Sequence, residues 1–172
     1  MNPLKKDAST RTKEYIESIR HVYIDLDRGA AESLEAVEHF SVVPTPNYVL
    51  NSSPEKHQVV WKVEGMNLQE AEGLLCAMAY EFGGDPAATD ATRVLRVPGF
   101  ANKKYDTDFY CRSPQRIHGK VQSSGFQTAL RLTVLPASEL QQPHESRVPA
   151  TEQFKSDRTR LGFRQTRPRP RR

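Results

Sequence analysis

The stretch HVYIDLD at residues 21–27 decides which fold this chain can adopt. Side chains of a strand point alternately to its two faces, so the three aliphatic residues would form one apolar face that needs a core. The opposite face would carry the residues with polar groups, which are His21, Tyr23, Asp25 and Asp27. The segment therefore predicts a strand with one buried face and one acidic face.

The two aspartates suit a site for divalent metal. Mg²⁺ is usually bound by one or two carboxylates together with substrate phosphates. Two such ions about 3.5–4 Å apart can activate a nucleophile and stabilise a leaving oxygen in phosphoryl transfer. The alternative is that Asp25 and Asp27 are solvated residues where the strand runs into a loop at Arg28-Gly29, because aspartate is common in turns. The pattern alone leaves both interpretations open.

A second polar segment belongs to a predicted hairpin. Residues 48–50 and 59–63 are rich in strand-forming residues, and Asn51-Ser52-Ser53-Pro54-Glu55 between them is typical of a turn. Lys56 and His57 would begin the return strand, with His57 on the same face as the apolar residues and at the rim of a cleft. Lysine and histidine can both contact phosphate oxygens. The alternative is a histidine with a structural role only.

A third segment joins an acid to basic residues. Asp90 precedes a strand predicted for residues 93–97, in which Arg93 and Arg96 would emerge on opposite faces unless a bulge brings them together. One arginine could then contact a phosphate or a base. Beyond Pro98-Gly99 the positive surface continues with Asn102, Lys103 and Lys104. The alternative is a half-buried strand whose arginines form salt bridges.

In this order the three segments resemble the RepB-type plasmid primase domains of the archaeo-eukaryotic primase superfamily. There, an Asp-x-Asp strand, a serine-rich turn ending in a histidine, and a third acid before an arginine strand form the polymerising site. The residues that carry the resemblance are Asp25 and Asp27, His57 after Ser52-Ser53-Pro54, and Asp90 ahead of Arg93 and Arg96. The stretch RVLRVPGFANKK at residues 93–104 is its most specific part, and it extends over residues 1–126.

The resemblance implies a DNA primase that synthesises short primers on single-stranded DNA from nucleoside triphosphates, in replication of a plasmid, phage or integrated element. It implies Mg²⁺ or Mn²⁺ as cofactor and an RNA-recognition-like core. The implied metal ligands are Asp25, Asp27 and Asp90. We prefer Asp90 to Asp85 as the third acid because its offset from the arginines fits the family, and because Asp85 can cap a helical turn before Pro86. The residues expected to contact the nucleotide are Ser53, Lys56, His57, Arg93 and Arg96.

In related proteins the phrase Asn2-Pro3-Leu4 usually follows an upstream strand and helix, so we expect the chain to lack that part of the domain. A replicative helicase or a relaxase is a further candidate partner.

The remaining chain alternates helix and strand patterns. Helices are predicted for residues 30–40 and for residues 68–82, the second with an apolar stripe and a stop at Gly83-Gly84. Further strands are predicted at residues 109–111 and 129–135. The fold class is therefore α+β, a mixed and largely antiparallel sheet with packed helices.

Composition indicates one small domain. At 172 residues and 37% hydrophobic content the chain can bury one core of ordinary size. No apolar run approaches the roughly 20 residues of a membrane span and no signal peptide opens the sequence, so we expect a cytoplasmic protein with no membrane partner. Cys76 and Cys111 form no Cys-x-x-Cys pattern and are expected to be reduced structural thiols.

The net charge of +4 is unevenly divided. Residues 147–172 contain nine basic and two acidic residues, a net of +7, so the catalytic domain predicted for residues 1–146 carries −3. The segment has few apolar residues, which predicts a disordered tail. It could bind nucleic acid or serve as a solubilising linker. Its candidate DNA-binding residues are Arg164, Arg167, Arg169, Arg171 and Arg172.

The sequence thus predicts a nucleotidyltransferase of the primase type. A metal-dependent nuclease could use the same acids, and a non-catalytic replication or mobilisation factor could keep the fold and bind DNA. These alternatives stay open at the level of sequence.

Overall fold

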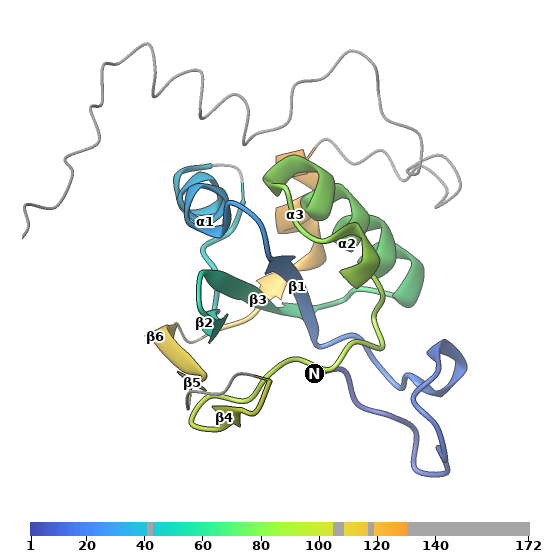
Figure 1. The fold of residues 1–172 in the computed structure, drawn as a ribbon. Helices are drawn as coiled ribbons and strands as arrows, with labels where there is room; N and C mark the ends of the chain where they lie inside the picture. Colours follow the sequence, from blue (N-terminus) through green and yellow to red (C-terminus); the bar gives the residue numbers. More distant parts are fainter. Residues whose placement is uncertain (41–42, 105–108, 117–118, 131–172) are drawn as a thin grey trace, which may run out of the picture.

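The computed structural model describes residues 1–40, 43–104, 109–116 and 119–130. The principal sheet has five strands in the order β1-β3-β2-β6, with β7 paired to β3 (Figure 1). All pairings are antiparallel except that of β7 with β3. The bounds of its strands are β1 His21–Leu26, β2 Tyr48–Ser53, β3 Lys56–Glu64, β6 Arg112–Arg116 and β7 Val121–Gln122.

The helices lie together on one side of this sheet in Figure 1, while a small hairpin of β4 and β5 lies on the other side. The long segment that joins α2 to β4 also crosses that second side. The bounds are α1 Ala30–His39, α2 Leu68–Phe82, α3 Ser123–Leu130, β4 Ala101–Asn102 and β5 Phe109–Tyr110, with short 3₁₀ turns η1 Lys13–Tyr15 and η2 Pro86–Ala88. Only one face of the sheet is covered by helices.

The core fills the space between the sheet and the helices. The aliphatic face of β1 is fully buried there, as the alternation predicts. Trp61 of β3 meets Phe126 of α3 edge to face with ring centroids 5.9 Å apart, and Phe40 meets Phe82 in the same way at 5.6 Å. Such aromatic pairs stabilise a core beyond their area of burial. The mixed, largely antiparallel class predicted from the sequence is confirmed.

Helix α2 begins and ends at residues that are typical of helix caps. Asn67 and Glu70 form a reciprocal capping box at its start, and Gly83 ends it in the left-handed conformation with φ of 66°. Gly84 then passes so close to β1 that a Cβ on it would lie 2.6 Å from Cγ2 of Ile24. The backbone N–H of Asp85 donates to the carbonyl of Asp25 at 2.8 Å. The chain leaving α2 is thereby fixed to the acidic end of β1.

Several element predictions are confirmed and two are wrong. Helix α1 and the hairpin of β2 and β3 are observed, and the hairpin turn is only two residues, Pro54 and Glu55, with Glu55 at φ of 57°. Residues 93–97 form no strand, because they pair with no neighbouring strand. Residues 129–130 belong to α3 instead of a strand, and residues 131–135 lie outside the described part.

Other sequence predictions are tested only in part. Both cysteines are free thiols, Cys76 in α2 and Cys111 between β5 and β6. None of the helices in the described part of the chain has the length and apolar character needed to span a membrane. The predicted basic tail at residues 147–172 lies outside the described residues, as do its five candidate DNA-binding arginines.

Candidate active site

A polar pocket of about 560 Å³ opens at the acidic end of β1, on the sheet face that the helices leave uncovered. It is formed by the end of β1, the hairpin turn of β2 and β3, and the segment after η2. The residues that line it are Asp25, Asp27, Ser52, Ser53, Lys56, Gln58, Arg93, Val94, Leu95, Arg96 and Lys104. Apart from Lys104, six residues of the predicted site line this pocket. They come from three separate segments of the chain.

The two carboxylates of this pocket differ in environment. Asp25 is half-buried, and burial followed by the neighbouring Asp27 carboxylate raises its pKa above the ordinary value, with Gln58 and Arg93 acting in the opposite direction. Asp27 is exposed and forms an ion pair with Nζ of Lys56 at 2.7 Å. The pocket thus holds one carboxylate that resists ionisation and one that already has a cation as partner.

Gln58 is the residue of this pocket that the sequence analysis missed. The strand register places it directly opposite Asp25. Its Nε2 donates to Oδ2 of Asp25 at 3.5 Å, and its Oε1 accepts from the backbone N–H of Arg96 at 3.2 Å. The alternation of β3 contained the signal, because the apolar residues Val59 and Trp61 define the face that the helices must cover.

His57 lies on that covered face together with Val59 and Trp61, as the alternation predicted, and it does not line the acidic pocket. The register pairs it with Leu26 of β1 and Asn51 of β2, while Asp25 pairs with Gln58. Burial lowers the pKa of His57, which Glu38 of α1 partly offsets. Its Nδ1 is buried without a hydrogen-bond partner among the described residues. Its expected contact with a triphosphate has no support from this position.

The two arginines of the third segment line the same pocket. Residues 93–97 follow an irregular path, so Arg93 and Arg96 are not held on the opposite faces that a regular strand would give them. Arg93 is close enough to Asp25 to lower its pKa. Both side chains are exposed. An anion in the pocket would therefore meet two guanidinium groups on one wall.

Asn102 holds this wall to the hairpin turn. Its Nδ2 donates to the carbonyl of Ser52 at 3.1 Å and to Oγ of Ser53 at 2.9 Å, and its side chain is buried. This use of the amide makes Asn102 a structural residue in place of the exposed nucleic-acid contact that we expected. Lys103 and Lys104 are exposed, and Lys104 reaches the pocket.

The two candidates for a third acid are both engaged by nearby backbone. Asp90 is half-buried and its Oδ1 accepts from the backbone N–H of Thr92 at 3.0 Å and from the Thr92 hydroxyl. It lies beside Tyr23 and does not line the pocket. Asp85 caps η2 through Ala87, as predicted. Among the described residues no three His, Cys, Asp or Glu side chains gather as metal ligands, so the metal role of Asp90 stays a prediction.

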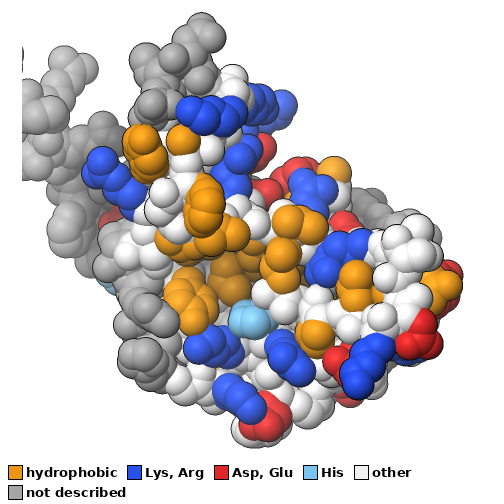
Figure 2. All heavy atoms as spheres, turned by 90° about the horizontal axis from the view of Figure 1, so that it is seen from below, with side chains coloured by type: hydrophobic (Ala, Val, Ile, Leu, Met, Phe, Trp, Pro, Cys, Tyr) orange, Lys and Arg blue, Asp and Glu red, His pale blue; other side chains and the backbone are white. Residues whose placement is uncertain are grey.

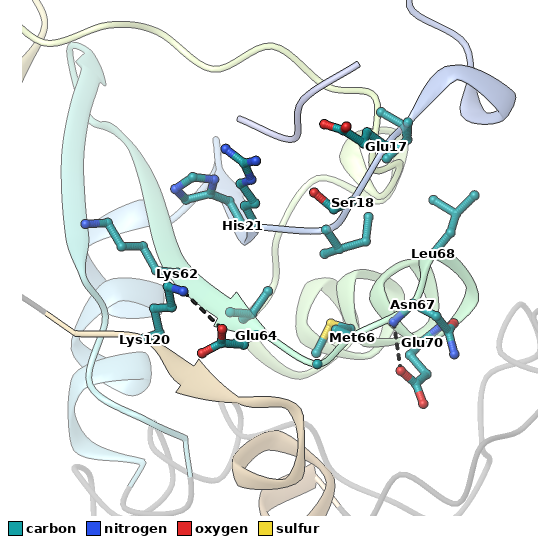
Figure 3. A pocket seen from close by; sticks show the side chains of 15 residues that line it. Glu17, Ser18, His21, Lys62, Glu64, Met66, Asn67, Leu68, Glu70 and Lys120 are labelled. Carbon is teal, nitrogen blue, oxygen red and sulfur yellow. Dashed lines mark hydrogen bonds and ion pairs between the residues drawn. The ribbon is translucent and has the colours of Figure 1, made fainter. Parts of the chain in front are cut away.

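A larger pocket of about 1090 Å³ lies at the opposite end of β1 (Figure 3). Its charged groups are largely engaged: Lys120 forms an ion pair with Glu64 at 3.1 Å, and Glu70 belongs to the cap of α2. Burial, followed by nearby positive charge, lowers the pKa of His21 to about 4, so this imidazole is neutral at pH 7. Size alone therefore does not make this pocket the catalytic one.

Comparison with known proteins gives a family. Residues 1–132 match the model described as the RepB DNA-primase N-terminal domain. The chain belongs to this family. A replication protein of Clostridium perfringens is 33% identical to this RepB-type primase domain over an alignment of 117 residues that covers 56% of the chain and 27% of that protein. The chain therefore spans little more than a quarter of that curated relative.

Solved structures share the fold of the RepB-type domain. The AEP domain of the cyanophage S-2L primase-polymerase has a TM-score of 0.61 at 16% identity, covering 70% of this chain and 64% of that one. The catalytic domain of primase RepB′ in complex with initiator DNA has a TM-score of 0.52 at 20% identity, covering 88% and 66%. At these identities the likeness concerns the fold alone.

Primases of this family generally use divalent metal, and the acidic pocket of the RepB-type domain fits such an ion. Asp25 and Asp27 are oxygen ligands of the kind that Mg²⁺ prefers, and two carboxylates with substrate phosphates are a common set. Burial and, after it, the neighbouring Asp27 carboxylate raise the pKa of Asp25, and a cation bound between the two carboxylates would relieve both effects. Metal ligation by these two residues is therefore chemically reasonable.

Proposed function

We propose that this domain transfers nucleotides from nucleoside triphosphates to a growing primer on single-stranded DNA. The observation that carries the proposal is the pocket in which Asp25 and Asp27 face Lys56, Arg93 and Arg96. Carboxylates for metal opposite cations for phosphate are the arrangement that phosphoryl transfer needs, because this chemistry depends mostly on positioning and charge neutralisation.

Each group of the pocket has a definite task in this proposal. Mg²⁺ or Mn²⁺ bound at Asp25 and Asp27 would neutralise charge on the phosphates and on the attacking oxygen. Lys56 leaves its ion pair with Asp27 to bind a phosphate oxygen. Arg93 and Arg96 bind the triphosphate with their planar guanidinium groups, which suit phosphate better than a lysine does. The Ser53 hydroxyl adds a short-range hydrogen bond.

The proposal extends to the biological setting that the family suggests. The chain would act in replication of a plasmid, phage or integrated element, where primers are needed on exposed single strands. One of the structural relatives is described in complex with initiator DNA, which supports DNA as the template. A replicative helicase or a relaxase as partner and a cytoplasmic location remain predictions from the sequence.

A primer-synthesis assay tests the proposal. The full chain is incubated with a single-stranded DNA circle, labelled nucleotides and Mg²⁺ or Mn²⁺. We expect labelled oligonucleotides from the wild type and none from the Asp25→Ala, Asp27→Ala double variant. Degradation of the DNA without incorporation would make the protein a nuclease, and neither product from a folded, DNA-binding protein would make it a non-catalytic factor.

The non-catalytic alternative has one observation in its favour. Asp90, the expected third metal ligand, uses its carboxylate to cap Thr92 outside the pocket. A domain with two suitable carboxylates in place of three could retain DNA binding without catalysis. Titration with Mn²⁺ followed by electron paramagnetic resonance would separate these cases, because the wild type but not Asp25→Ala should bind the ion when nucleotide is present.

A further inference from the structure

Exposed hydrophobic side chains concentrate in one segment of the chain. Among the described residues, large hydrophobic side chains are exposed at seven positions, and four of these lie between residues 94 and 110. The most exposed is Phe100, with 70% of its surface accessible, and Tyr110 has 49%. The other two are Val94 and Val97. A group of exposed apolar side chains on one segment marks a surface that binds a partner.

The two aromatic residues lie at the small hairpin of β4 and β5. The carbonyl of Phe100 accepts from the backbone N–H of Cys111 at 3.0 Å, and Tyr110 pairs directly with Ala101. Asn102 ties the same hairpin to the turn of β2 and β3 through Ser53. Backbone pairing thus holds both residues at this hairpin, and both side chains are exposed.

The charge of the surrounding surface selects the kind of partner. The exposed side chains in this part of the chain include five cations, which are Arg93, Arg96, Lys103, Lys104 and Arg112. On the side of the molecule opposite the helices, Lys and Arg side chains surround a hollow with hydrophobic side chains on its floor (Figure 2). Aromatic rings among cations suit single-stranded nucleic acid, whose bases stack and whose phosphates carry negative charge.

This surface is continuous with the acidic pocket. Arg93, Val94, Arg96 and Lys104 line the pocket and belong to the same segment as Phe100. A strand bound along the segment would therefore run from the aromatic rings to the carboxylates without a change of surface. An apolar partner protein would gain little from the ring of cations, which it would have to desolvate.

We propose that the exposed rings of Phe100 and Tyr110 each stack on bases of single-stranded DNA that leads into the acidic pocket. This inference rests on the proposed function in that the bound strand is the template. The aromatic rings contribute base contacts and the cations contribute phosphate contacts. The two contributions respond differently to salt and to the chemistry of the strand, so they can be measured separately.

The test is binding of labelled oligothymidylate to the full chain, in EDTA and without nucleotides, across a series of salt concentrations. Phe100→Ala should weaken binding about 5- to 150-fold, as expected for loss of one base stack. It should leave the slope of log affinity against log salt unchanged. Lys103→Gln with Lys104→Gln should flatten that slope by about 0.7 for each phosphate that the two lysines neutralise in the wild type. Tyr110→Ala should resemble Phe100→Ala.

Controls test whether the loss of binding comes from base stacking. Phe100→Trp should retain affinity and Phe100→Leu should lose it, because leucine is apolar but cannot stack. An abasic oligonucleotide of equal length should bind wild type and Phe100→Ala equally. Tyr80→Ala, on helix α2, removes a tyrosine that is 43% exposed and should bind as the wild type does.

Equal affinity of wild type and Phe100→Ala for oligothymidylate would overturn the stacking surface. So would full binding by Phe100→Leu, because leucine cannot stack on a base. Failure of the proposed catalysis is a separate result, because the binding assay contains neither metal nor nucleotide.

Discussion

Gln58 of β3 lies directly opposite Asp25 of β1, and its amide also accepts a hydrogen bond from the backbone of Arg96. One uncharged side chain therefore joins the acidic strand to the arginine segment. The amide nitrogen is 3.5 Å from the carboxylate, at the long end for a hydrogen bond. We therefore infer that Gln58 positions Asp25, through a contact weak enough to yield to a bound cation.

The first prediction compares the two neighbours on β3. Gln58→Ala should reduce nucleotide incorporation by roughly 10- to 100-fold, because misplaced ligands and arginines lose rate steeply. The loss should appear as a weaker response to Mg²⁺ in a metal titration of the rate. His57→Ala, one residue away on the covered face, should leave nucleotide kinetics within about twofold of the wild type, since it breaks no contact in the pocket. The reverse pattern would restore the triphosphate contact first expected of His57.

The second prediction concerns the carboxylates. Asp25→Ala or Asp27→Ala should lower incorporation by at least about 10²–10³-fold, because no neighbour replaces a lost charge-stabilising group. Circular dichroism should show an unchanged fold. Asp7→Ala removes an exposed carboxylate outside the pocket and serves as the control. Wild-type incorporation by the double variant at residues 25 and 27 would remove these residues from the mechanism.

The third prediction follows from the raised pKa of Asp25. The folded protein then holds the proton of Asp25 more tightly than the unfolded chain does, so ionisation of this residue opposes folding as the pH rises above the unfolded value of 3.8. Asp25→Asn should therefore raise the melting temperature at pH 7, and the gain should vanish as the pH falls below about 3.8. Asp27→Asn, which breaks an ion pair with Lys56, should give no such gain. Scanning calorimetry from pH 3 to 7 measures both, and equal behaviour of the two variants would contradict the assignment.

The fourth prediction uses the close approach of Gly84 to β1. In Gly84→Ala the new Cβ would lie 2.6 Å from Cγ2 of Ile24 and 3.3 Å from the carbonyl oxygen of Asp25. Overpacking of this kind should cost about 1–3 kcal/mol in free energy of unfolding. It should also lower incorporation, because the displaced strand carries the acids. Chemical denaturation with a parallel activity assay checks both effects, and an unchanged midpoint would mean that β1 yields without strain.

The sequence predicted those parts of the fold that depend on local patterns. Alternation along β1 identified its buried and acidic faces, and the capping residues around α2 located that helix. The prediction of a strand at residues 93–97 was wrong. Strand-forming residues need a partner strand, and in the described part of the chain this segment has none. The sequence of a strand alone cannot supply that information.

The sequence predicted most of the residues that line the candidate site, but it did not predict how they are arranged. Asp25, Asp27, Lys56 and the arginines of the third segment do meet in one pocket. His57 and Gln58 differ by one residue, and a shift of one residue moves a side chain to the other face of a sheet. Gln58 is the neighbour that lines the pocket, and the contact of His57 with a triphosphate stays a prediction. Only the cross-strand register with β1 decides between them.

Gly83 and Gly84 at the end of α2 constrain the length of that helix, because Gly84 packs against β1. Each added residue would turn the helix end by about 100°, and Gly84 would no longer meet Ile24 of β1. We therefore expect insertions within the 15 residues of α2 to destabilise the domain, although the helix does not line the pocket. An engineer who wishes to attach a reporter should leave this helix intact and choose the exposed turn at residues 6–7 instead.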